Sequence, residues 1–224
     1  MAMASRGFYL ACLLLGALGF LCILGTTYWA QHWRGGFAWD GGKHMFNWHP
    51  VLMVSGMVVL YGAASLVYRL PQAWLGPRLP WKALHAALHL GAFVLAVVGL
   101  VAVFRYHSHA GITHLYSLHS WLGLTTTVLF SCQPPEAAAC LLRSCHPVSV
   151  DGVCHLRHQR EAVLQPNATK PYHSLPSEAV FANSTGLLVV AFGVLVLYIL
   201  LASPWKRPEL GVLADRQPLL CDRE

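Results

Sequence analysis

The sequence predicts an all-α fold, a polytopic membrane helix bundle, and three observations carry this prediction. The 224 residues have a mean hydropathy of +0.51, and only 11% of them are charged. Apolar runs of membrane length recur along the chain. Histidines lie inside or at the edges of these runs, where an ionisable side chain costs several kcal/mol unless it is paired or used. The chain is therefore expected to hold a functional centre within the membrane.

The first apolar run extends from about Phe8 to Ala30 and is long enough to cross a bilayer of about 30 Å. A secretory signal peptide is the alternative interpretation. The apolar part exceeds the usual hydrophobic core of such a peptide, and Tyr28-Trp29 is typical of an interfacial aromatic belt rather than a cleavage site. A retained span is expected.

Four more runs follow, and three of them have full membrane length: Trp48 to Tyr68, Leu84 to Phe104 and Gly186 to Ala202. The fourth, Tyr116 to Cys132, reaches roughly the lower limit of 17 residues for a span. About four full spans plus one truncated helix are expected. If the short run only dips into the membrane from the luminal side, the last span runs from outside to inside, which is the favoured arrangement.

Basic residues beside the spans predict the orientation. Arg6, the Arg69–Lys82 connection and the Lys206-Arg207 pair fall on one side, which the positive-inside rule makes cytosolic. The formal charge of +6 is too thinly spread for a nucleic-acid surface. Two glycosylation sequons, at Asn167 and Asn183, are expected in a luminal loop just before the last span.

The chain is expected to divide into a transmembrane domain, 1–203, and a cytosolic tail, 204–224. The tail contains Asp215 four residues before Leu219-Leu220. This pattern is typical of an acidic dileucine sorting signal, read by adaptor complexes that deliver cargo to endosomes and lysosomes. A chance match is the alternative.

Four histidines occupy the ends of the apolar runs. His49 and His119 are expected near the luminal face, and His85 near the cytosolic face. Neutral imidazole is an axial ligand of haem iron. Two haem centres near opposite faces would divide the distance that an electron must travel across the membrane. His89 shares a helix face with His85, so one is a ligand and the other a neighbour. The alternative is that each histidine caps a helix or bonds a backbone carbonyl at the interface, and zinc is disfavoured because no CxxC or HExxH spacing occurs.

Two further groups of residues have two interpretations each. Arg69 and Lys82 flank the cytosolic loop outside His85, where they either set topology by snorkelling or bind an anionic donor or haem propionates. The luminal loop from Tyr106 to His114 holds three more histidines, which either bind a transition-metal acceptor or are merely solvated.

Together these motifs resemble the cytochrome b561 family over residues 1–132 and about 166–224. The matching segments are Phe46-Asn-Trp-His49-Pro50, Val67-Tyr-Arg69, Lys82-Ala-Leu-His85, Val101-Ala-Val-Phe104 and Tyr116-Ser-Leu-His119-Ser-Trp121. The region after Pro171, the last span and the tail look most like a lysosomal member. The resemblance implies six helices, two b-type haems, cytosolic ascorbate as donor and, in several members, ferric iron as acceptor.

The resemblance also implies roles for single residues. His49 and His119 would ligate the luminal haem, with Tyr116 and Ser117 in the same motif at the cofactor site. His85 would be one ligand of the cytosolic haem. Arg69 and Lys82 would serve ascorbate and the haem edge. A homodimer would fit the resemblance, while His89 receives no role from it.

Residues 133–165 depart from the family, because the fifth helix and its haem-ligating histidine are not visible there. A back-translation read one base later restores an apolar segment with a Lys-Pro-Pro-His start. A shifted reading frame, from a splice form or a faulty gene model, is therefore our hypothesis for this stretch.

The function expected from these observations is ascorbate-dependent reduction of ferric iron by haem b at the lysosomal or late-endosomal membrane. The alternative is a truncated, non-catalytic product that inserts in the membrane and binds one haem. A transporter is disfavoured, because the spans contain neither paired carboxylates nor broken helices.

Overall fold

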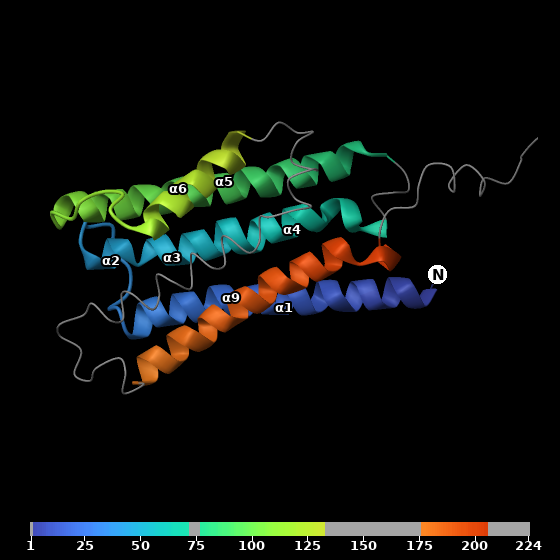
Figure 1. Ribbon diagram of the computed structural model, residues 1–224, viewed down its shortest axis with the longest axis horizontal. Coiled ribbons are helices and arrows are strands. Elements are labelled where there is room, and N and C mark those ends of the chain that lie inside the picture. Colours follow the sequence, from blue (N-terminus) through green and yellow to red (C-terminus); the bar gives the residue numbers. More distant parts are fainter. Residues whose placement is uncertain (1, 72–76, 133–175, 206–224) are drawn as a thin grey trace, which may run out of the picture.

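The computed structural model describes residues 2–71, 77–132 and 176–205, and every regular element in these ranges is helical (Figure 1). The α-helices in these ranges are α1 (Ala2–His32), α2 (Lys43–Phe46), α3 (Trp48–Met53), α4 (Tyr61–Leu66), α5 (Leu79–His109), α6 (Leu118–Cys132) and α9 (Ser177–Leu201). A π-helical segment, η1 (Val54–Leu60), joins α3 to α4, and the 3₁₀ turns η2 (Val67–Arg69) and η5 (Ser203–Trp205) follow α4 and α9. The predicted all-α bundle is confirmed.

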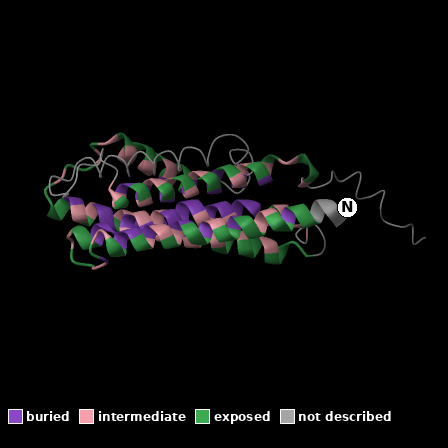
Figure 2. Ribbon diagram, turned by 90° about the horizontal axis from the view of Figure 1, so that it is seen from below, coloured by how far each residue is buried: buried purple, intermediate pink, exposed green. Residues whose placement is uncertain are grey.

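Four stretches of the described residues are long and apolar enough to cross a membrane: Arg6–His32, Lys43–Arg69, Leu79–His109 and Ser177–Leu201. They agree with the four full spans expected from hydropathy. Large apolar side chains such as Leu13, Phe20 and Leu90 point outward and are more than 60% exposed. Buried residues gather along the middle of the bundle (Figure 2). The outer surface is therefore built to contact lipid tails.

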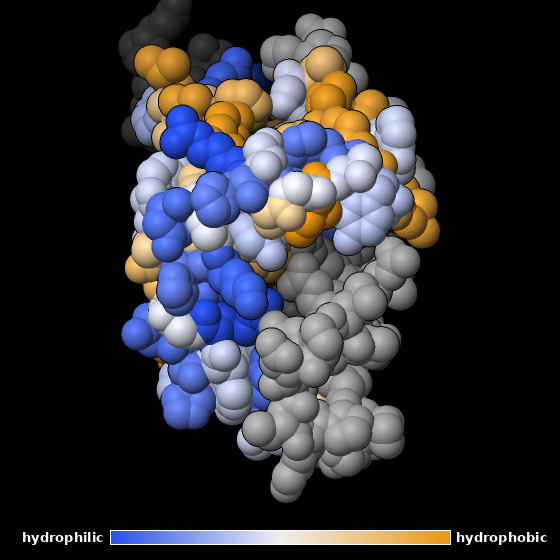
Figure 3. Space-filling view, turned by 90° about the vertical axis from the view of Figure 1, so that its left-hand side faces the viewer, coloured by the Kyte–Doolittle hydropathy of each residue, from blue (hydrophilic) through white to orange (hydrophobic). Residues whose placement is uncertain are grey.

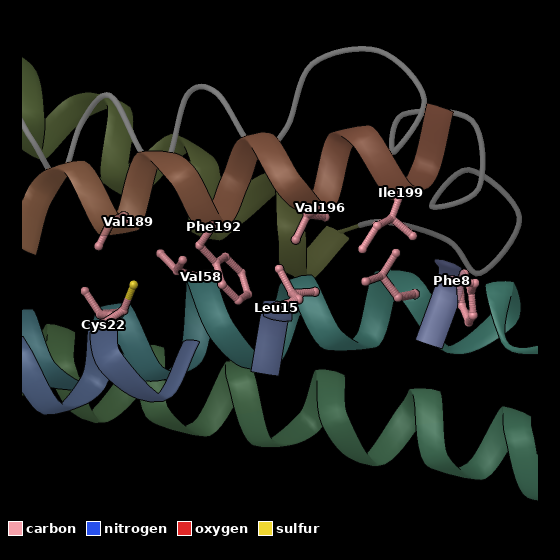
Figure 4. Packing of buried hydrophobic residues seen from close by; sticks show 10 residues of the cluster. Phe8, Leu15, Cys22, Val58, Val189, Phe192, Val196 and Ile199 are labelled. Carbon is pink, nitrogen blue, oxygen red and sulfur yellow. The ribbon is translucent and has the colours of Figure 1, made fainter. Parts of the chain in front are cut away.

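Helices α1 and α9 pack antiparallel over their whole length. The ring of Phe8 lies 5.7 Å from that of Trp205 at one end. At the other end, Trp29 Nε1 donates to Glu178 Oε1 at 3.2 Å. Between them a buried row that includes Leu15, Cys22 and Phe192 forms the main core (Figure 4). The last span therefore ends where the first begins.

The described part of α6, Leu118–Cys132, is shorter than a membrane span. Its 15 residues extend about 22 Å at 1.5 Å per residue, against a hydrocarbon core of about 30 Å. It starts at the end of the bundle where α9 also starts, and runs back beside α5 (Figure 1). The last span therefore runs the opposite way to α1, as in the arrangement favoured from the sequence, and the dip of the fourth run into the membrane stays a prediction.

Helix α9 begins at Ser177, nine residues before the expected start at Gly186. Hydropathy misses this part because it contains Glu178, Asn183, Ser184 and Thr185. The two hydroxyls bond to carbonyls of their own helix, Ser184 to Val180 and Thr185 to Phe181. The expectation that Asn183 lies in a loop before the span is therefore wrong, because it lies in the second turn of α9.

Candidate functional site

The end of the bundle that carries the starts of α3, α6 and α9 presents a largely hydrophilic surface (Figure 3). His49 lies just inside this end, on the first turn of α3, and its side chain is buried. Its Nδ1 lies 3.0 Å from the carbonyl oxygen of Gly99 on α5. A carbonyl can only accept, so this contact places the proton on Nδ1 and leaves Nε2 as the atom with a lone pair for a metal.

His119 comes from the first turn of α6 and faces His49. The two ring centroids are 6.2 Å apart, and the ring planes are inclined at 83°. Two imidazoles that ligate one iron from opposite sides have centroids roughly 6 Å apart, since each metal–nitrogen bond is about 2 Å and each nitrogen lies about 1 Å from its ring centre. The pair therefore fits a shared haem iron, which requires two imidazole ligands on different helices.

Ser117 positions His119 through the backbone. The amide of Ser120 donates to Ser117 Oγ at 3.2 Å, and the two hydroxyls are 2.9 Å apart. This is a side-chain cap on the first turn of α6. Tyr116, the residue before it, is exposed, and its ring lies 6.4 Å from that of His107. Both residues were grouped with the cofactor site, and their contacts here are structural.

His85 repeats the bonding pattern of His49 at the opposite end of the span. Its Nδ1 lies 2.9 Å from the carbonyl oxygen of Ala64 on α4, which again leaves Nε2 for a metal. The ring also lies 4.8 Å from Tyr68 and 4.3 Å from His89. Within the described ranges no histidine of another helix faces His85 as His119 faces His49.

His89 lies one turn deeper on the same face of α5. Its ring stacks on Phe130 of α6 at 5.4 Å and meets Tyr61 edge-on at 5.5 Å. Its Nε2 is buried without a hydrogen-bond partner. His85 and His89 stand side by side on one helix, so they cannot ligate one haem iron from opposite faces.

Arg69 and Lys82 lie at the end of the bundle where α1 begins. The guanidinium of Arg69 donates from Nη2 to the carbonyl of Leu200, in the last turn of α9. Arg69 therefore ties the second span to the last one and caps a helix C-terminus. Lys82 is exposed on the first turn of α5. The two residues therefore lie at the same end of the bundle but have different surroundings, and their shared role as a donor site stays a prediction.

The helix ends and the α5–α6 loop at the opposite end of the bundle carry further histidines, and the expected loop from Tyr106 is helical as far as His109. His107 and His114 stack at 5.8 Å, and His114 Nε2 lies 3.2 Å from Ser108 Oγ. Asp40 accepts a backbone bond from Gly42 at 2.8 Å and pairs with His44 at 3.5 Å. The Gly42 bond is the main reason that the pKa of Asp40 is lowered from 3.8, and His44 adds to it. No group of three metal-ligating side chains occurs among the described residues.

Sequence reasoning missed the residues that orient the histidines. Gly99 and Ala64 act through backbone carbonyls, and such acceptors leave no side-chain signal in a sequence. Several expected sites lie outside the described residues: the 133–165 segment, Asn167 and the tail residues Asp215, Leu219 and Leu220.

Comparisons with known proteins agree on one family. Residues 48–164 match the model described as eukaryotic cytochrome b561. The chain is 64% identical to the lysosomal membrane ascorbate-dependent ferrireductase CYB561A3 of Mus musculus, over 99% of this chain and 100% of the mouse protein. It is 62% identical to the Homo sapiens protein of the same name, with the same coverage. It is 41% identical to the plasma membrane ascorbate-dependent reductase CYBRD1 of Xenopus tropicalis, over 85% of this chain and 74% of that protein.

The alignments also bear on the segment that departs from the pattern. The matched family range runs through residues 133–164, so this stretch counts as part of the same domain. The alignment to the mouse protein extends over 242 positions, 18 more than the 224 residues of this chain. That relative therefore has residues without a counterpart here.

Proposed function

Because the chain belongs to the eukaryotic cytochrome b561 family, we propose that it is a transmembrane oxidoreductase that passes electrons from ascorbate to ferric iron. The observation that carries the proposal is the facing pair of His49 and His119, with ring centroids 6.2 Å apart. Haem b, when bound, supplies the one-electron chemistry. The names of the mouse and human relatives supply the donor, the acceptor and the lysosomal membrane. The dileucine tail favours the same compartment.

His49 and His119 hold the haem near the luminal end, and the carbonyl of Gly99 keeps His49 in the ligating tautomer. Ferric iron is the substrate at this end, where His114 of the α5–α6 loop and Asp40 are exposed. No side chain needs to exchange a proton with substrate for the electron to leave.

Ascorbate is anionic and binds at the opposite end, near Lys82. Lys82 is exposed and able to meet a small anion, whereas Arg69 is held by Leu200. His85, one turn inside this end, is the ligand that the chain offers to a second haem. The carbonyl of Ala64 prepares it as Gly99 prepares His49. The two ends together define a path through the bundle.

The test uses the purified full chain, reconstituted with haem, and its His119→Ala variant. We expect the wild-type chain to show a low-spin, six-coordinate haem spectrum that ascorbate reduces and ferric citrate reoxidises. His119→Ala should lose that spectrum, because a haem with one axial ligand becomes five-coordinate or dissociates. An unchanged low-spin spectrum in His119→Ala would remove the basis of the proposal. Ser120→Ala is the matched control on the same turn of α6.

A second candidate function is favoured by two observations. No histidine of another helix faces His85 within the described ranges, and the mouse relative has residues without a counterpart here. A chain that holds only the His49–His119 haem would bind haem without passing electrons through the membrane. The number of haems per chain separates the two functions.

A further inference from the structure

The second span and α5 are joined by two histidine bonds, one in each direction. His49 of the second span bonds to Gly99 of α5, and His85 of α5 bonds back to Ala64 of the second span. The helices are antiparallel, so the two bonds close the same interface at its two ends. Anything that changes the register of this interface must therefore change both histidines.

The spacing along α5 is regular. His85, Ala92 and Gly99 are separated by seven residues each, and Ala92 and Gly99 are buried. Two helices that pack along each other keep the same face in contact every seven residues, because 3.5 residues fill one turn of such a pair. Each heptad of α5 therefore returns to the same side of the interface.

The second span has one residue more than the seven-residue repeat of α5 requires. Gly56 lies seven residues after His49, but Ala64 lies eight residues after Gly56. Gly56 faces the midpoint of α5: a Cβ on Gly56 would lie 2.9 Å from the carbonyl oxygen of Ala92 and 3.0 Å from Leu95 Cβ. An uninterrupted α-helix would therefore present the residue before Ala64 to His85.

The π-helical segment η1 (Val54–Leu60) absorbs the additional residue. The amide of Tyr61 bonds to the carbonyl of Gly56, five residues earlier, where an α-helix would bond four residues back. A bond of this kind encloses one residue more than an α-helical bond. The eight-residue step from Gly56 to Ala64 can therefore lie opposite the seven-residue step from His85 to Ala92. π-helical turns of this kind are frequent at functional sites.

We infer that η1 and Gly56 set the register that allows His49 and His85 to keep their Nδ1 bonds at the same time. Gly56 is then a positioning residue: it touches neither histidine, and lies at the midpoint between their two bonds. Because His49 and His85 are haem ligands only under the proposed function, this role of η1 in haem binding rests on it. The register itself belongs to the apoprotein.

The test deletes one residue either from the second span, between Gly56 and Ala64, or from the part of α5 that faces it, between His85 and Ala92. Deletion of Val59 removes the additional residue, so η1 should become α-helical and both bonds should persist. Deletion of Leu90, a lipid-facing residue of α5 in the same layer, leaves six residues opposite eight and should break the His85 bond. In nitrogen-15 spectra of haem-free protein, we expect the Val59 deletion to keep the hydrogen-bonded Nδ1–H resonance of His85 and the Leu90 deletion to lose it. Equal loss in both deletions would overturn the inference.

A glycine pair gives a second, milder test. Gly56→Ala places a Cβ against the Ala92 carbonyl and should force the helices apart. Gly91→Ala meets only Leu60 Cδ1 at an ordinary 3.4 Å. We expect Gly56→Ala to weaken haem affinity about 10- to 100-fold, as loss of an outer-shell partner does. Gly91→Ala should leave haem affinity unchanged.

Nitrogen-15 spectra of the histidine rings in haem-free protein separate this inference from the proposed function. Gly56→Ala should shift the Nδ1–H resonances of both His49 and His85, and Gly91→Ala should shift neither. Equal spectra for the two variants would overturn the register role, whether or not haem binds. Failure of the His119→Ala test would instead remove the haem function and leave the register intact.

Discussion

Lys82 and Arg69 have opposite surroundings, although the sequence predicts a shared task for them. Lys82 is an exposed cation, so Lys82→Ala should raise the KM for ascorbate about twofold to fivefold, the worth of one exposed charge contact. Its thermal unfolding midpoint should stay unchanged. Arg69→Ala removes the bond to Leu200 and should lower the unfolding midpoint. The two measurements are steady-state kinetics and thermal unfolding in detergent, and a stability loss in Lys82→Ala would contradict the assignment.

Asp40 gives the loop between α1 and α2 a defined response to acid. Its pKa is lowered from 3.8, chiefly because its carboxylate accepts the Gly42 amide. A depressed pKa means that the carboxylate stabilises the fold above 3.8 and that this stabilisation disappears as the pH falls through the folded value. The difference in thermal unfolding midpoint between wild type and Asp40→Asn should therefore be constant above pH 3.8. It should decline below that pH and vanish once the pH is below the folded pKa of Asp40. His44→Gln, which removes the lesser cause, should shift the midpoint less than Asp40→Asn.

The two glycosylation sequons should behave differently. The Thr185 hydroxyl of the Asn183 sequon is buried and bonded to Phe181, inside a membrane helix. We expect Asn183→Gln to leave the glycan-dependent mobility of the expressed protein unchanged, and Asn167→Gln to abolish it. Treatment with a glycosidase before electrophoresis makes the comparison, and loss of the shift in Asn183→Gln would show that the second turn of α9 is accessible during synthesis.

At the scale of single elements, hydropathy predicts the existence of the spans better than their ends. The four full spans follow from long apolar runs. The early start of α9 could not be predicted in this way, because its polar residues bond within the helix. The π-helical η1 could not be predicted from the sequence either, because the apolar run from Val54 to Leu60 is equally typical of an α-helix. Its signal is the spacing of His49, Gly56 and Ala64 against α5, which needs the paired helix to be known.

Helix α6 makes a prediction about Cys132, the last residue of its described part. The helix extends about 22 Å from the luminal end, so this thiol should lie within the hydrocarbon layer. In a variant that keeps Cys132 as its only cysteine, a membrane-impermeant maleimide should fail to label it from either side. The matched control keeps only Cys221, in the predicted cytosolic tail, which should be labelled from the cytosolic side. Cytosolic labelling of Cys132 would mean that the fourth run spans the membrane after all.

For the whole molecule, the sequence and the structure agree best at one end of the bundle. The family resemblance that the motif around His119 carries implies its pairing with His49, and the folded helices bring the two rings together. The partner of His85 cannot be assigned in the same way, because a histidine motif predicts a ligand only if the helix that carries it is recognisable. Residues 133–165 contain no such helix in their sequence. Transmembrane electron transfer therefore depends on this segment more than on any other part.

A graft tests this dependence directly. Residues 133–165 would be replaced by the corresponding segment of the mouse relative, which matches the rest of the chain closely. The unaltered chain should retain about one tightly bound haem, because one facing histidine pair is complete, and the graft should raise the number to about two. Haem per protein is measured from the pyridine haemochrome spectrum. In vesicles loaded with ferricyanide, external ascorbate should then drive faster reduction through the grafted chain. Two haems and equal rates in the unaltered chain would mean that it supplies its own second ligand to His85, and the single-haem alternative would be wrong.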